Sequence, residues 1–203
     1  MKEIPLFNTK IKVIYRCNIQ DDLNYMDNIL FKNCYFTNLV NKLPIIQGGK
    51  IENLSLTNYT CEDKFYINKQ YGKNSRKTTI NNLSIKYTTF KENFKLHNCE
   101  INNIDIEDTD FEKHADFFKT IFHNGKTNNE SIYFKAINFK GLALFGDTEF
   151  KSKVIFKYIT FEGFSHFRKA IFHKGLDLDY CNIQQEMNFF DAKKLDGEDS
   201  RKN

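Results

Sequence analysis

The chain has 203 residues, of which 40% are apolar and 15% aromatic, which is the composition of a folded protein rather than of a disordered one. The 30 basic and 26 acidic residues leave a net charge of +4, so the global charge gives no strong case for nucleic-acid binding. No apolar run approaches the ~18 residues of a membrane helix, and no hydrophobic signal region follows the first residues. Five cysteines without CxxC spacing then indicate reduced thiols and a cytoplasmic protein.

Residues 1–10 are expected to form an N-terminal cap or a first irregular strand, and residues 11–195 a single repeat domain. A short motif recurs in the first half of this domain, as IENLSL at 51–56, INNLSI at 80–85 and INNIDI at 101–106. Five residues after each motif comes one further large or apolar residue, namely Cys61, Phe90 and Phe111. A bulky residue every five positions is therefore the basic rule of this region.

From Phe134 onward the large apolar residues fall at intervals of alternately five and six. Ten consecutive positions of this series are filled, eight of them by Phe, whereas random placement would give about one. The residues that we expect to form an inward core ladder are Phe31, Phe36, Ile51, Leu56, Ile80, Ile85, Phe90, Leu96, Ile101, Ile106, Phe111, Phe117, Phe122, Phe134, Phe139, Phe145, Phe150, Phe156, Phe161, Phe167, Phe172, Leu178 and Ile183.

The position two residues before each bulky one is often small. Residues two apart lie on the same face of an extended chain, so each repeat has one large and one smaller inward residue, followed by a polar pair. This arrangement describes a short strand and a turn. Residues two positions after a bulky one are then expected in turns, where Asn and Gly are favoured, and these are Asn53, Asn82, Asn103, Gly141 and Gly163.

Two other interpretations of the period are less consistent with the residues. An eleven-residue period can indicate a right-handed helical supercoil, but positions five apart lie roughly 140° apart around a helix and form no single seam. Thr, Ile, Phe, Asn and Gly are also weak helix formers. Strict intervals of six would indicate a hexapeptide β-helix, whereas the intervals here include five throughout.

These residues resemble the pentapeptide-repeat family over roughly Ile19 to Ile183. The segment FKGLALFGDTEF at 139–150 is similar to the Phe-rich branch of that family, in which five- and six-residue spacings alternate. The resemblance implies an all-β fold, a right-handed quadrilateral β-helix with four pentapeptides to a coil and with capped ends.

Two stretches interrupt the spacing. Residues 64–79 are rich in basic side chains and residues 123–131 in turn formers, so both are expected to be loops that project from the coil. Residues 196–203 form a polar tail in this interpretation. The pair Phe189 and Phe190, near the last coil, could pack as a cap or join a second copy end to end.

Reactive side chains show no arrangement that indicates chemistry. Four of the five cysteines take the small inward position, where a thiol is buried and protonated, and their wide separations do not suit zinc. The histidines, which form no HxxxH pair, are expected on the surface; they are His97, His114, His123, His166 and His173. We therefore expect no metal, no cofactor and no enzymatic activity.

Local charge is more informative than net charge. One stretch is acidic and another basic, and each would form a patch on a wall of the coil, either as an ordinary solvated surface or as a binding surface for a charged partner. The acidic residues are Glu100, Asp105, Glu107, Asp108, Asp110, Glu112 and Asp116, and the basic ones include Lys64, Lys69, Lys73, Arg76 and Lys77.

The function that these features favour is a non-catalytic scaffold that binds a protein partner through its wall, loops or ends, with a second copy of the chain as one candidate partner. The family resemblance offers an alternative, because some pentapeptide-repeat proteins imitate DNA and bind gyrase or another type II topoisomerase. A DNA mimic requires an acidic rod, and in this chain of net charge +4 only the acidic stretch would serve.

Overall fold

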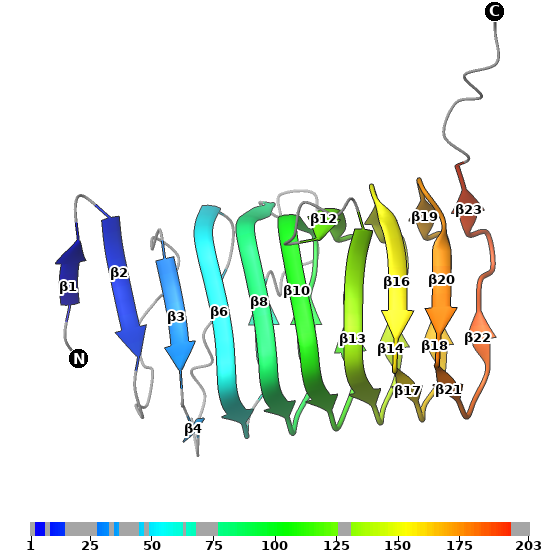
Figure 1. Cartoon of the computed structure of the whole chain (residues 1–203), viewed down its shortest axis with the longest axis horizontal. Coiled ribbons are helices and arrows are strands. Elements are labelled where there is room, and N and C mark those ends of the chain that lie inside the picture. Colours follow the sequence, from blue (N-terminus) through cyan, green and yellow to red (C-terminus); the bar gives the residue numbers. More distant parts are fainter. Residues whose placement is uncertain are drawn as a thin grey trace, which may run out of the picture.

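A computed structural model describes residues 3–6, 9–14, 28–32, 35–36, 45–46, 49–62, 64–67, 77–125 and 131–195, with side chains from residue 51 onward. Every described element is a β-strand, and every strand pairing except the first is parallel. The strands lie side by side along the long axis of the molecule in chain order (Figure 1). The fold is therefore all-β, with the chain advancing along one axis as it returns to the same strand positions.

Four columns of parallel strands make up this arrangement. The first column contains the beginnings of three long strands and then four short ones, which are β6 (Gly49–Cys61), β8 (Thr78–Phe90), β10 (Cys99–Phe111), β12 (Ile121–Gly125), β15 (Glu149–Phe150), β19 (Ile171–Phe172) and β23 (Lys193–Lys194). The second column contains β2 (Thr9–Ile14), β3 (Asn28–Lys32), the middles of β6, β8 and β10, then β13 (Ser131–Phe139), β16 (Lys153–Lys157) and β20 (Leu176–Asp179).

The third and fourth columns complete each coil. The third contains β4 (Tyr35–Phe36), the ends of β6, β8, β10 and β13, then β17 (Thr160–Phe161) and β21 (Asn182–Ile183). The fourth contains β5 (Ile45–Ile46), β7 (Phe65–Ile67), β9 (Phe94–Leu96), β11 (Ala115–Asp116), β14 (Ala143–Leu144), β18 (Ser165–His166) and β22 (Met187–Asn188). β1 (Glu3–Leu6) pairs antiparallel with β2, so residues 1–10 contribute a strand and part of a hairpin.

Aromatic rings stack through the interior because parallel register places equivalent residues one strand spacing apart. In the third column Phe90, Phe111, Phe139 and Phe161 stack at 5.1–5.2 Å between ring centroids. In the fourth column the ring of Phe145 lies 4.8 Å from the rings of both neighbours. The expected ladder from Ile51 to Phe172 is buried throughout.

The ladder differs from expectation at its end. Leu178 and Ile183, expected in the core, are 41% and 42% exposed, because they lie in the last described coil and no described strand covers them. At the other end, register places Phe31 beside Leu56 and Phe36 beside Cys61, but the side chains of Phe31 and Phe36 lie outside the described ones.

The turns also differ from expectation. Left-handed backbone occurs two residues after the inward residue, but only after the second and fourth columns, and these residues are Asn58, Tyr87, Asn98, Asp108, Lys119, Ala136, Asp147, Tyr158, Lys169, Tyr180 and Asp191. The five Asn and Gly residues predicted for such turns follow the other two columns, and none of them has a positive φ.

These five residues are explained by contacts between coils instead. The side-chain amide of Asn82 donates to Asn53 at 2.7 Å, and that of Asn103 donates to Asn82 at 3.0 Å, so the three amides form a ladder between coils. At Gly163 a Cβ atom would lie 2.3 Å from the carbonyl oxygen of Gly141. Glycine is required there because the two backbones approach closely.

The two predicted loops are shorter than expected. Within 64–79, residues 65–67 form β7 and β8 begins at Thr78, whereas Lys69, Lys73 and Arg76 lie outside the described residues. Within 123–131, β12 continues to Gly125 and β13 begins at Ser131. The tail expected at 196–203 also lies outside the described residues.

Candidate interaction surface

The acidic stretch does not form one patch. A run of sequence that makes a complete turn around the fold distributes its outward residues over all the columns. Glu100 lies in the first column, Asp105 and Glu107 in the second, Asp110 in the third and Asp116 in the fourth. The negative charge therefore encircles one coil rather than extending along one wall.

Most of this negative charge is also paired with lysines of neighbouring coils. Glu100 accepts from Lys77 at 2.7 Å, and Glu112 lies 3.5 Å from Lys140. The Lys86 ammonium lies 2.9 Å from Asp105 and 3.2 Å from Glu107, and Glu107 also accepts from Lys135. Hydrogen bonds from Lys135 and Lys86 hold the pKa of Glu107 below its ordinary value.

Asp116 and His97, both expected on the surface, are buried. They are 8% and 2% exposed, and the Asp116 carboxylate lies 2.7 Å from His97 Nε2. The other carboxylate oxygen of Asp116 accepts from the backbone N–H of Phe118. Both carboxylate oxygens of Asp116 therefore have partners, and we interpret this buried ion pair as structural.

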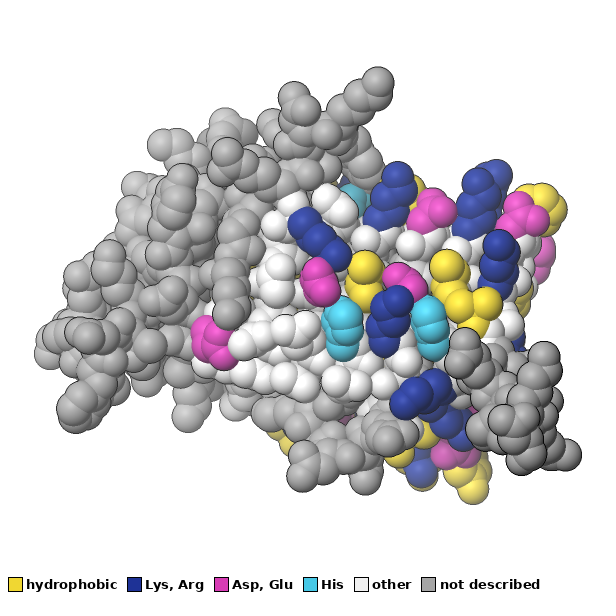
Figure 2. Space-filling model, turned by 90° about the horizontal axis from the view of Figure 1, so that it is seen from above, with side chains coloured by type: hydrophobic (Ala, Val, Ile, Leu, Met, Phe, Trp, Pro, Cys, Tyr) yellow, Lys and Arg dark blue, Asp and Glu magenta, His cyan; other side chains and the backbone are white. Residues whose placement is uncertain are grey.

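Two further histidines lie on the outward side of the first column. His123 Nε2 is 2.9 Å from Glu100, and His173 Nε2 is 2.7 Å from Glu149, which also contacts Lys151. Figure 2 shows this face, where histidine, lysine and acidic side chains lie close together. Within the described ranges, no three His, Cys, Asp or Glu side chains are placed to hold a metal ion.

The described cysteines take positions in the wall of the coil. Cys61 and Cys99 are buried, and Cys181 is half-buried with its thiol 3.2 Å from the carbonyl oxygen of Phe156. Burial raises the pKa of the Cys181 thiol, which keeps it protonated at neutral pH.

Exposed apolar side chains gather at the last coil, residues 176–195, which we call the terminal coil. Six of the ten large exposed hydrophobic residues of the described chain belong to it: Leu178, Tyr180, Ile183, Phe189, Phe190 and Leu195. Its four strands, β20 to β23, each pair with a described strand on one side only. Open strand edges and exposed apolar side chains together are typical of a binding surface.

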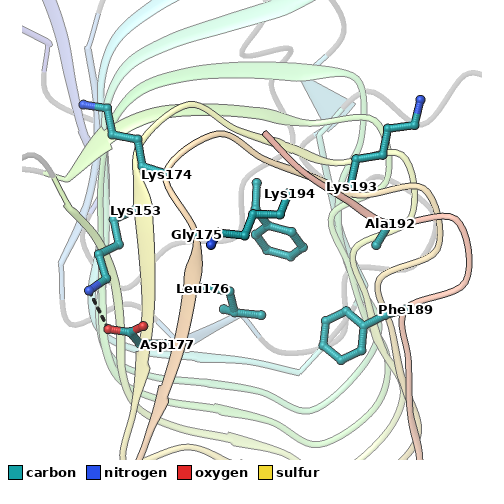
Figure 3. Close-up of a pocket in the computed structure, with 10 residues that line it drawn as sticks. Lys153, Lys174, Gly175, Leu176, Asp177, Phe189, Ala192, Lys193 and Lys194 are labelled. Carbon is teal, nitrogen blue, oxygen red and sulfur yellow. Dashed lines mark ion pairs between the residues drawn. The ribbon is translucent and has the colours of Figure 1, made fainter. Parts of the chain in front are cut away.

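A bowl of about 530 Å³ opens at this end of the molecule (Figure 3). Its floor is apolar, formed by Phe172, Leu176, Phe189 and Ala192, and Lys153, Lys174 and Lys193 lie around it. Lys153 pairs with Asp177 at 2.6 Å, as the dashed line in Figure 3 shows. An apolar floor with charged side chains around it suits the binding of a partner.

Lys194 occupies a position where the earlier coils have an apolar residue. Its register partner is Phe172, which follows Phe150 and Phe122 in the first column. Figure 3 shows its side chain crossing the bowl toward Gly175, and its Cε would lie 3.8 Å from a Cβ there. The 22-residue interval from 150 to 172 to 194 is the sequence signal that could identify this position, which is absent from the expected ladder.

Comparisons of the chain with protein-family models, with curated proteins and with solved structures find no match. Among the residues that the structure describes, no helix is long and apolar enough to cross a membrane.

Proposed function

We propose that this chain is a non-catalytic scaffold that binds a protein partner through its terminal coil. The observation that carries this proposal is the concentration of exposed apolar side chains on residues 176–195, next to four open strand edges. Large exposed apolar patches on folded proteins commonly mark interaction sites. The other walls of the fold differ from the terminal coil, because their charged residues form ion pairs with each other between coils.

The architecture that we propose for this scaffold is the right-handed quadrilateral β-helix of pentapeptide-repeat proteins. Four strand columns per coil, inward residues five or six apart and stacked Phe rings support it. We do not propose that the chain binds gyrase as a DNA mimic, because its acidic residues encircle one coil and pair with lysines.

The test compares two surfaces of matched exposure. In one variant the terminal coil is changed by Ile183→Ser and Phe190→Ser, which are 42% and 60% exposed. In the control, Tyr133→Ser and Tyr87→Ser change side chains that are 36% and 57% exposed on earlier coils. Each purified protein is immobilised, proteins retained from lysate of the source cells are identified, and binding is repeated with the purified partner.

We expect the terminal-coil variant to lose at least tenfold in affinity for the purified partner and the control to bind as the unchanged chain does. Equal binding by both variants would place the interaction elsewhere. Failure of the unchanged chain to retain any protein would contradict the proposed function.

A further inference from the structure

The outward side of the fourth column holds its cations differently from the other walls. On the other three walls, lysines pair with carboxylates of a neighbouring coil, as they do with Glu100, Glu107 and Glu112. The fourth wall consists of the outward side chains of residues 93–98, 114–119, 142–147 and 164–169. Its cations are Lys95, Lys119, Arg168 and Lys169. None of these four forms an ion pair with a residue that the structure describes.

Two of these cations lie over aromatic rings instead. The ammonium of Lys119 is 5.2 Å from the ring centroid of Phe118, and the guanidinium carbon of Arg168 is 5.6 Å from that of Phe190. Lys119 and Arg168 are both exposed. Contact with a ring face leaves the N–H groups of a cation available, so both side chains can still donate hydrogen bonds to an anion.

An uncovered aromatic ring lies on the same wall. Phe164 is 46% exposed, and its ring contacts no other ring of the described chain. It directly precedes β18, and the residue that directly precedes β14 is Leu142, so the equivalent position one coil earlier is apolar too. An exposed ring of this kind can stack on a planar group of a partner.

The exposed charge of the fourth wall is mainly positive. Asp147 is its one exposed carboxylate among the described residues, since Asp116 is buried against His97. On the same side, the terminal coil carries Glu186 and Asp191, so the positive region ends before that coil. Four cations against one exposed carboxylate favour an anionic partner.

We propose that the fourth wall binds single-stranded nucleic acid. Phe164 offers a face on which a base stacks, and Arg168 and Lys169 donate hydrogen bonds to phosphate oxygens. Proteins that bind single strands without sequence preference combine these two features, an exposed ring and a positive surface. The proposal goes beyond the proposed function, because it concerns a different surface from the terminal coil.

Two other anionic partners are less complementary to this wall. The carboxylates of an acidic peptide match the cations but leave the ring of Phe164 unused. The bases of a duplex stack on each other, so their faces cannot reach the ring, whereas a single strand supplies both phosphates and free base faces. Four cations allow few phosphate contacts, so binding should be weak and should strengthen as the salt concentration falls.

The test measures fluorescence anisotropy of a labelled oligothymidylate of about 12 nucleotides at several salt concentrations. One variant, Phe164→Ala, removes the stacking face. A second variant, Arg168→Ala with Lys169→Ala, removes two phosphate contacts. Circular dichroism of each variant confirms that it is folded.

Each variant has a matched control on another wall. Tyr158→Ala removes an aromatic side chain that is 51% exposed, on the turn after the second column. Lys91→Ala with Lys140→Ala removes the same charge from the third wall, where the two lysines pair with carboxylates.

We expect the unchanged chain and both controls to bind the oligothymidylate equally. Phe164→Ala should weaken binding about fivefold or more, as the loss of one stacked base does. The double variant should weaken binding at least tenfold at low salt. It should also reduce the slope of the logarithm of affinity against that of salt concentration by about 1.4, or ~0.7 for each phosphate contact.

Three results would overturn the proposal. The first is an unchanged chain that does not bind the oligothymidylate at low salt. The second is a control that weakens binding as much as its matched variant, which would place the contact on another wall. The third is competition by polyglutamate or by a DNA duplex as strong as that of unlabelled oligothymidylate, which would show that the wall recognises negative charge and not a single strand.

Discussion

A single Phe in this fold contacts rings of the coils on both sides of it. Phe145 is fully buried, and its ring stacks at 4.8 Å on both Phe117 and Phe167. The Phe145 side chain stabilises the fold by leaving water and by packing against both rings. The neighbouring rings cannot move to fill its place, because strand pairing fixes the spacing between coils.

Phe145→Ala is expected to lower the free energy of unfolding by about 3–5 kcal/mol, since it leaves a cavity between two fixed rings. Urea unfolding followed by circular dichroism measures the change. Phe164→Ala is the control, because that side chain is 46% exposed and its loss should cost under about 0.5 kcal/mol. Equal losses would show that the stacked column is not the core.

Glu107 makes stability depend on pH. Its folded pKa lies below the ordinary value of 4.5 because Lys135 and Lys86 hydrogen-bond its carboxylate. A lowered folded pKa means that the stabilisation is present above pH 4.5 and is lost as pH falls through the folded pKa. The pair with Lys135 is partly exposed, so salt screens it and its contribution is small.

Glu107→Gln should therefore lower the free energy of unfolding by about 0.5–1 kcal/mol at pH 7. At a pH below the folded pKa of Glu107 it should leave that free energy unchanged. Urea unfolding of both proteins between pH 3 and pH 7 gives this difference. A deficit that grew toward acid pH would show that the shift has the opposite sign.

At the level of the strands and turns, close approach between successive coils decides which residues are tolerated. Gly163 lies where its Cβ would come 2.3 Å from a backbone oxygen, and a backbone atom cannot move without disturbing the strand register. Gly146 faces a side chain instead, and its Cβ would lie 3.3 Å from the ring of Phe118.

Gly163→Ala is expected to destabilise the protein by about 1–3 kcal/mol through overpacking against Gly141. Gly146→Ala should cost less, because the Phe118 ring can shift by a few tenths of an ångström. Thermal unfolding of the two variants compares them directly. A larger loss for the Gly146 variant would contradict the stacking at Gly141 and Gly163.

For the whole molecule, stability is a property of neighbouring coils, because each coil contacts only those next to it. The middle of the described chain, around β8 and β10, has partners on both sides, whereas β20 to β23 pair on one side only. Local opening should accordingly begin at the terminal coil.

Hydrogen exchange is expected to be faster for the amides of 176–195 than for those of 99–111, by at least tenfold at low protein concentration. Uniform exchange along the chain would show that the coils do not open independently.

The inward ladder could be predicted from the sequence because burial repeats with the strand period. Phe134 and Phe156 lie 22 positions apart, Phe161 follows Phe156 by five, and all three are buried. The limits of the loops are harder to predict, since Phe65 and Thr78 begin strands inside a stretch whose charge suggests a loop. In these residues, hydrogen-bonded pairing with strands of the adjacent coil outweighs the local preference for a loop.

The sequence by itself determined the all-β class, the repeat and the identity of the core, because each depends on the spacing of apolar residues along the chain. Only the tertiary structure decided where the charges lie, since Glu100 and Asp110 lie in different strand columns of the same coil and Asp116 is buried against His97. It also decided that Leu178 and Ile183 are exposed. Their spacing matches that of the core, but burial requires a covering coil, and the structure describes none beyond them.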